Sequence, residues 1–161
     1  MRNLRLRCPN SDDNPWVYEK AAGLQNCEVP HIMFTLRIAR RRGVHWAHFT
    51  GVVTSAELEA LDQAAIEYAA CHGPVHAIRD FFDADAIAIP ETTIVHRARR
   101  PHLMPRRKRI VVVRTFEHEA LARLCATERI NFGGVEPPEI VRSIGVAFER
   151  FQVTEADFEA L

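Results

Sequence analysis

Apolar residues occupy every second position from Phe34 to Ile38, and polar residues stand between them. This alternation predicts a half-buried strand over residues 34–39. Residues 40–43 predict a turn, and residues 44–50 predict a second strand. Because the connection is short, we expect the two strands to pair as an antiparallel hairpin at one side of a sheet.

Thr54 and Glu57 have the T-x-x-E spacing of a capping box. In this motif the Thr oxygen accepts a hydrogen bond from the third amide of a helix, and the Glu carboxylate accepts one from the amide of the Thr. The motif predicts the start of a helix with an apolar stripe. The segment from His72 to Pro74 predicts its end.

A buried strand is predicted over residues 75–80, followed by an acidic turn and then by a helix whose first residue is Pro90. Open α/β sheets bind ligands and partners at the carboxyl ends of their strands. The stretch from Val75 to Arg100 is therefore the expected functional end of the molecule.

Four successive β-branched residues predict that residues 109–114 form a strand buried on both faces and parallel to residues 75–80. A helix over residues 117–127, a short edge strand at residues 130–132 and a helix opening at Pro138 follow. The order β-β-α-β-α-β-α-(β)-α indicates an α/β fold. We expect a mixed sheet of four to five strands with an N-terminal antiparallel hairpin and a parallel centre, packed by about four helices.

Residues 1–32 show no sustained apolar periodicity of a strand or a helix, and they contain Pro9, Pro15 and Pro30. They predict a poorly ordered N-terminal extension, and the alternative is that translation starts at Met33. Residues 33–161 are expected to form one globular domain, a length that allows a substantial core.

The 21 basic residues balance the 21 acidic ones, so no global field attracts nucleic acid or an anionic membrane. Cys8, Cys27, Cys71 and Cys125 are widely spaced, which indicates reduced thiols. No segment has the roughly 20 apolar residues of a membrane span, and the N-terminus lacks a signal peptide. These features predict a soluble cytoplasmic protein.

Residues 33–161 resemble the SpoIIAA-like group of STAS domains, the fold of anti-sigma-factor antagonists, which is akin to CRAL-TRIO lipid-binding domains. The resemblance rests on the hairpin of residues 34–50, the G-x-V-T-x-x-E segment from Gly51, the strand ending in Arg79, Asp80 and Phe81, the K-R-I-V-V-V strand from Lys108, and the C-terminal helix. It implies the STAS fold and a regulatory or interaction role without a catalytic signature.

Phospho-regulated members of that family carry a phosphorylatable Ser at the start of the helix after the central strand, where backbone amides favour an anion. This chain has Pro90, Glu91, Thr92 and Thr93 in that region. Thr92 or Thr93 would then be the phosphoacceptor. The alternative is that both are ordinary residues of a first helical turn.

The resemblance and the position after the central strand predict one binding surface. Its residues are Asp80, Asp83, Asp85, Glu91, Thr92 and Thr93. Closely spaced carboxylates also suit a hard cation, but aspartates at a strand exit are explained by turn formation. We therefore expect no metal site.

A second candidate site is a local concentration of positive charge, because seven of the 21 basic residues fall within thirteen positions. The predicted anion patch comprises Arg97, Arg99, Arg100, Arg106 and Arg107. The alternative is a solvated helix end, where arginines complement the dipole. Nucleic acid is not expected, because no aromatic residues are interleaved with the basic ones.

The chain lacks a recognisable nucleophile-base pair, phosphate loop or metal-ligand pattern, so we expect neither an enzyme nor a cofactor. The first hypothesis is a non-enzymatic regulatory domain of STAS type that binds a protein partner through the surface after the central strand. The alternative is a carrier or sensor of a small amphipathic or phosphate-bearing anion, with an apolar cleft under residues 90–100 and arginines at its mouth. Whether the protein forms a homodimer stays open.

Overall fold

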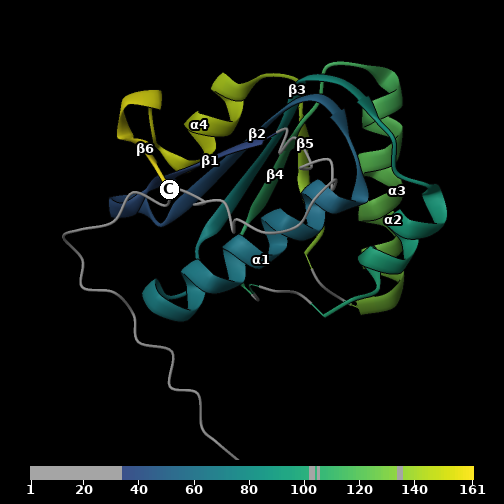
Figure 1. Cartoon of the computed structure of the whole chain (residues 1–161), viewed down its shortest axis with the longest axis horizontal. Helices are drawn as coiled ribbons and strands as arrows, with labels where there is room; N and C mark the ends of the chain where they lie inside the picture. Colours follow the sequence, from purple (N-terminus) through teal and green to yellow (C-terminus); the bar gives the residue numbers. More distant parts are fainter. Residues whose placement is uncertain (1–33, 102–103, 105, 134–135) are drawn as a thin grey trace, which may run out of the picture.

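The computed structural model describes residues 34–101, 104, 106–133 and 136–161 (Figure 1). The predicted N-terminal extension over residues 1–32 lies outside the described residues. The described elements are β1 (Phe34–Ala39), η1 (Arg40–Arg42), β2 (Val44–Val53), α1 (Ser55–His72), β3 (His76–Ile87), α2 (Glu91–Ala98), β4 (Arg109–Val112), α3 (Phe116–Gly133), β5 (Glu139–Val141), α4 (Ile144–Phe151), η2 (Glu155–Asp157) and β6 (Glu159–Ala160).

The strands described form one six-stranded mixed sheet in the order β5-β4-β3-β2-β1-β6. The predicted hairpin is confirmed, because β1 and β2 pair antiparallel from Phe34 opposite Phe49 to Ala39 opposite Val44. Gly43 closes the turn at a φ of 58°, a left-handed conformation that glycine adopts without strain. Strand β2 pairs in parallel with β3, β3 with β4 and β4 with β5, which confirms the parallel centre.

The helices cover the sheet on both faces, and each face carries a hydrophobic core. Residues from α1, α2 and α3 pack with Phe49 and Phe81 on one face. On the other face α4 covers Trp46, Ile78 and Ile110. Figure 1 shows α2 and α3 standing together beside the strands, with α1 running diagonally across the sheet. The α/β class and its four α-helices agree with the prediction.

The capping box that was predicted at the start of α1 is present. The Oγ1 atom of Thr54 accepts the amide of Ala56 at 3.2 Å, and the Glu57 carboxylate accepts the amide of Thr54 at 2.8 Å. The helix ends at His72, and the amide of Gly73 donates to the carbonyl of Ala69. These contacts fix the register of α1 over the sheet.

Strand β3 is longer than predicted, because it does not turn at Asp80 but continues to Ile87. Its second half pairs with the end of β2, where Thr50 lies opposite Asp83 and Val53 opposite Ile87. The pairing contains register shifts, so the alternation that the sequence shows up to Asp80 is interrupted beyond it. Pro90 is the N-cap of α2 and not its first residue.

Two predictions in the C-terminal third are wrong. Residues 130–132 are the end of α3 and not a strand, and Ile130 and Phe132 are exposed there at 57% and 58%. The residues after Pro138 form β5, parallel to β4, and the last α-helix begins only at Ile144, after the N-cap Ser143. The apolar residues of β5 had been assigned to the helical stripe. With β5 and β6, the sheet exceeds the predicted four to five strands.

Candidate functional site

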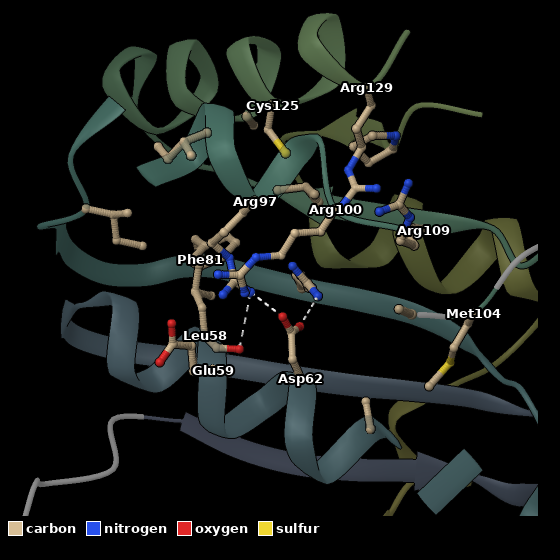
Figure 2. A pocket seen from close by; sticks show the side chains of 18 of the residues that line it. Leu58, Glu59, Asp62, Phe81, Arg97, Arg100, Met104, Arg109, Cys125 and Arg129 are labelled. Carbon is tan, nitrogen blue, oxygen red and sulfur yellow. Dashed lines mark hydrogen bonds and ion pairs between the residues drawn. The ribbon is translucent and has the colours of Figure 1, made fainter. Parts of the chain in front are cut away.

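A pocket of about 360 Å³ lies between one face of the sheet and the helices α1, α2 and α3 (Figure 2). Strands β2, β3 and β4 form its floor, and the helices form its walls together with Arg100, Met104 and Arg107 from the connection between α2 and β4. The volume falls within the roughly 300–1,000 Å³ of small-molecule sites. The pocket therefore has room for a small organic ligand.

Strand alternation places three nitrogen-rich side chains on the floor of this pocket. His45 comes from β2, Arg79 from β3 and Arg109 from β4. Ala77 pairs with His45 on one side and with Arg109 on the other, so these two residues share a row of the sheet. Arg79 lies two positions further along β3 and faces the same way. Residues next to them in sequence face the opposite core.

His45 is buried, with 4% of its surface exposed. Burial and, to a smaller extent, the nearby positive charge of Arg79 lower its pKa to about 4, against the opposing effect of Asp62. The imidazole is therefore neutral at neutral pH. It adds a polar but uncharged group to the floor.

Asp62 of α1 joins the floor to the wall. Its Oδ1 atom accepts a hydrogen bond from Arg79 at 2.9 Å, and its Oδ2 atom pairs with Arg97 of α2. Arg97 also donates to the backbone carbonyl of Leu58 at 3.4 Å. Figure 2 shows Asp62 pointing toward the Arg97 side of the pocket. One carboxylate thus partners two guanidinium groups, and one positive charge stays in excess.

Several donors of the pocket find no acceptor in the protein. Among the described residues, the buried side-chain nitrogen and oxygen atoms without a hydrogen-bond partner are Arg79 Nε, Arg97 NH1, Arg109 Nε, Arg129 Nε and His118 Nδ1. Every one of these atoms belongs to a residue that lines the pocket. Buried polar groups are otherwise almost always paired, so this concentration makes the pocket a candidate binding site.

Arg109 and Arg129 point toward each other in the pocket (Figure 2). Among the neighbouring charged groups, Arg129 has the largest effect on the pKa of Arg109. Burial and the charges of Arg129 and Arg79 together lower the pKa of Arg109 to about 9. In the described chain, the guanidinium of Arg109 has one acceptor, the backbone carbonyl of Glu136 at 3.2 Å. Like charges are held together here without a carboxylate between them.

The charge of the lining is strongly positive. Its acidic side chains are Glu59 and Asp62. Its arginines are Arg79, Arg97, Arg100, Arg107, Arg109 and Arg129. Burial lowers the pKa of His118, as it does for His45, so neither histidine adds charge at neutral pH. The excess of guanidinium groups favours an anion.

Most of the remaining lining is apolar. Leu58, Phe81, Ile89 and Ile94 line the pocket and belong to the core beneath α1 and α2. Figure 2 shows Leu58 and Phe81 away from the Arg109 and Arg129 pair. A ligand that fits both parts has an anionic head and an apolar body.

The predicted anion patch is divided by the structure. Arg97, Arg100 and Arg107 line the pocket. Arg99 instead lies over the ring of Phe132 at 3.8 Å and pairs with Glu128 at 3.1 Å. Arg106 is exposed and is not part of the lining.

Arg79, Arg109 and Arg129 were not among the predicted site residues. The sequence carried a signal for two of them, since Arg79 lies within the predicted central strand and Arg109 opens the apolar run of the next strand. Such residues are rarely buried unless they are paired or functional. For Arg129 the sequence carries no comparable signal, because arginine is common on helices.

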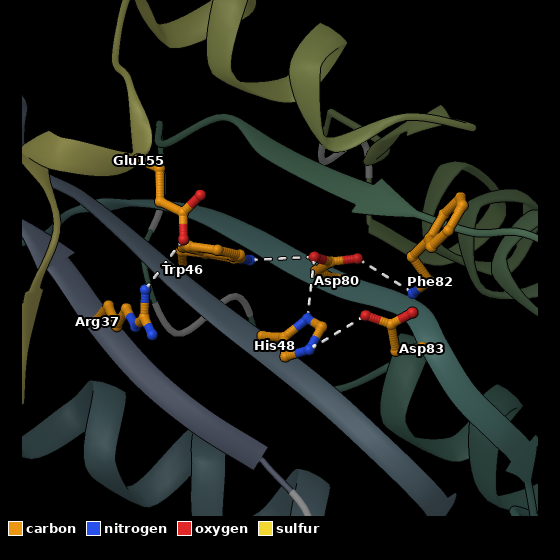
Figure 3. Close-up of polar contacts among 7 residues, drawn as sticks. All are labelled: Arg37, Trp46, His48, Asp80, Phe82, Asp83 and Glu155. Atoms are coloured by element: carbon orange, nitrogen blue, oxygen red, sulfur yellow. Dashed lines mark hydrogen bonds and ion pairs between the residues drawn. The ribbon is translucent and has the colours of Figure 1, made fainter.

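Asp80 does not lie on the exposed surface predicted after the central strand, because it is only 3% exposed and faces the α4 side of the sheet. Its Oδ2 atom accepts from Trp46 Nε1 at 3.2 Å and lies 3.1 Å from His48 Nδ1, and its Oδ1 atom accepts the amide of Phe82 at 3.0 Å (Figure 3). His48 Nε2 lies 3.4 Å from Asp83. Asp80 organises the interior at this end of β3.

The other residues of the predicted surface lie toward solvent. Asp83, Asp85, Glu91 and Thr92 are exposed, and Thr93 is half-buried in the first turn of α2. Within the described ranges, no three His, Cys, Asp or Glu side chains are grouped as metal ligands would be.

Comparison of the chain with models of known protein families and with curated proteins found no match. The class that the structure defines is therefore an α/β protein with a six-stranded mixed sheet and an arginine-lined pocket. No helix in the part of the chain that the structure describes is long and apolar enough to cross a membrane.

Proposed function

We propose that this protein is a non-enzymatic carrier or sensor of a small amphipathic anion, which it binds in the pocket between the sheet and α1, α2 and α3. The observation that carries the proposal is the set of buried donors without a protein acceptor, all on residues that line one pocket. Arginine is well suited to this task, because its planar fork donates two parallel hydrogen bonds to a carboxylate, sulfate or phosphate.

Burial of the ligand's apolar body supplies the second part of the affinity. Each Å² of apolar surface removed from water contributes about 25 cal/mol. Leu58, Phe81, Ile89 and Ile94 of the lining belong to the core, so the walls that meet the ligand body are held in place by their own packing. A preformed pocket loses little conformational entropy when the ligand enters.

The first experiment is native mass spectrometry of the full chain purified without detergent. Wild type is compared with Arg129→Gln and with the control Arg123→Gln. Arg129 lines the pocket, whereas Arg123 lies on the same helix, is 68% exposed and pairs with Glu119. We expect wild type and Arg123→Gln to retain a discrete additional mass that Arg129→Gln loses.

Binding of decyl sulfate is measured in parallel by thermal shift and calorimetry, with decanol as the uncharged control. A ligand at one hundred times its Kd stabilises the folded state by about 2.7 kcal/mol, which a melting curve resolves. Decyl sulfate is expected to raise Tm of wild type and of Arg123→Gln more than decanol does. Protein of bare mass that no alkyl anion stabilises would contradict the proposal.

A second candidate function is the interaction with a protein partner through the surface after the central strand. One observation favours it: β4 pairs with β3 only as far as Asp80, and no described strand pairs with that edge of β3 beyond it. An open edge accepts an added strand from a partner, and Phe82 is partly exposed there. The test is a pull-down with Asp83 and Glu91 both changed to Lys, with Glu149→Lys as the control. Identical partners for all three proteins would remove this candidate.

A further inference from the structure

The arginines of the pocket differ in how much of their charge the protein already neutralises. Asp62 serves Arg79 and Arg97 together. Arg109 and Arg129 both line the pocket and have no carboxylate partner among the described residues, and each has a buried Nε atom without a hydrogen-bond partner. Two guanidinium groups therefore converge on one place without any negative charge of the protein between them.

A head group with a single negative charge would leave that pair half neutralised, in a setting where burial strengthens the repulsion. A head with two negative charges matches the pair. It also supplies enough oxygen atoms to accept from both Nε groups and from the terminal nitrogens of each fork. A phosphate monoester has this charge and this number of acceptors at neutral pH, since its second pKa is about 6.

We propose that the head group held between Arg109 and Arg129 is a dianion of the phosphate monoester type, and that the apolar walls of Leu58 and Phe81 hold the body attached to it. This inference rests on the proposed function and adds the charge of the ligand. The body comes from a lipid-like chain or from another apolar group, and the probes below separate the head from the body.

The test compares two probes that share a tetrahedral head and a ten-carbon chain but differ in charge. Decyl phosphate is mostly a dianion at pH 8, whereas decyl sulfate is a monoanion. Affinities of the full chain for both are measured by calorimetry below their micelle concentrations, and inorganic phosphate is tested as a competitor. We expect decyl phosphate to bind roughly ten- to a hundredfold more tightly than decyl sulfate, as one more charge-assisted hydrogen bond provides.

Variants of the pocket arginines test which residues cause the preference for decyl phosphate over decyl sulfate. Arg129→Gln and Arg109→Gln are expected to reduce the ratio of the two affinities to about threefold or less, because the second negative charge then has no partner. Arg123→Gln, on the same helix but outside the pocket, should keep the wild-type ratio. Circular dichroism melts confirm that each variant is folded. Arg129→Lys should retain part of the preference, since it keeps the charge but loses the fork.

The outcomes separate the inference from the proposed function. Decyl sulfate binding as tightly as decyl phosphate would overturn the dianion and leave the amphipathic-anion pocket standing. An unchanged ratio in Arg129→Gln and Arg109→Gln would also overturn it, because the preference would then arise elsewhere. If neither probe binds more tightly than decanol, or if inorganic phosphate alone binds as well as decyl phosphate, the proposed function itself fails.

Discussion

Replacing Arg109 with Met should make the protein more stable and at the same time a poorer binder. Arg109 lies in β4 with Ala77 as its neighbour in the sheet, and its Nε atom is buried without an acceptor. A Met side chain fills a similar volume, needs no hydrogen bond and packs flexibly against apolar neighbours. Glu136, whose carbonyl accepts from Arg109, is exposed and is satisfied by water in the variant.

The magnitude follows from the electrostatics of the floor. Burial and the neighbouring Arg129 and Arg79 lower the pKa of Arg109 to about 9 from 12.5. At 1.36 kcal/mol for each pKa unit, this corresponds to roughly 4–5 kcal/mol against the charged form. Solvent at the mouth of the pocket and the lost hydrogen bond to Glu136 reduce the gain in the variant. We expect a net increase of about 1–2 kcal/mol in the free energy of unfolding, as buried charges replaced by apolar groups often give.

The assay is urea unfolding of the full chain at pH 7, with the melting temperature as a second measure. An increase of 1–2 kcal/mol corresponds to a rise of about 3–8 °C for a domain of this size. Arg123→Met is the control, because Arg123 is exposed and its change should stay within about 0.5 kcal/mol. A loss of stability in Arg109→Met that exceeds the control would refute the reasoning, since Arg109 would then be a structural residue.

Three further outcomes are expected. Because the pKa of His45 is lowered to about 4, the unfolded state binds a proton that the folded state lacks between pH 4 and pH 6.5. Stability therefore falls as the pH drops through that window, and His45→Gln should remove about 2 kcal/mol of the loss between pH 7 and pH 5 in urea unfolding. Asp80→Ala should reduce stability by about 2–3 kcal/mol and shift the fluorescence of Trp46, whose indole N–H loses its acceptor. Asp62→Asn should reduce stability by about 2 kcal/mol but tighten decyl sulfate binding in calorimetry, because Arg79 and Arg97 lose their carboxylate.

The elements that the sequence predicted correctly carry local signals. The hairpin has period-two alternation and a short turn at Gly43, and α1 has a capping box at Thr54 and Glu57. Each of these signals depends on residues within a few positions of one another. The parallel pairing of β3 with β4 was also predictable, because a run of β-branched residues after a helix is typical of an α/β sheet.

The wrong predictions fall where local patterns support two structures. Apolar residues around Ile140 and Val141 fit a helical stripe, yet β4 offers them an open parallel edge and Ser143 caps the helix that follows. Strand β3 extends past Asp80 because β2 continues beside it with shifts in register. Pairing over such a distance is not encoded in the spacing of either segment alone.

The site could be predicted only where its charge was concentrated along the chain. Arg97, Arg100 and Arg107 fall within eleven positions of the sequence, and all three line the pocket. Arg79 and Arg129 are separated by β4 and most of α3, so only the fold brings them together. The neutral overall charge of the chain gave no hint of a pocket with a strong excess of positive charge.

The excess of positive charge in the pocket carries a cost in stability. A buried donor without an acceptor costs about 1–3 kcal/mol, and domains of this size are stable by only about 5–15 kcal/mol. Apolar residues in place of Arg109 and Arg129 would fill the same space without this cost, and apolar side chains such as Leu58 and Phe81 already line the pocket. We therefore expect guanidinium groups at these positions to weaken the isolated fold, and under the proposed function the anion that they bind offsets this loss. Binding of an anion in the pocket should therefore raise the stability of the wild-type protein more than that of Arg109→Met, which lacks one of the buried guanidinium groups.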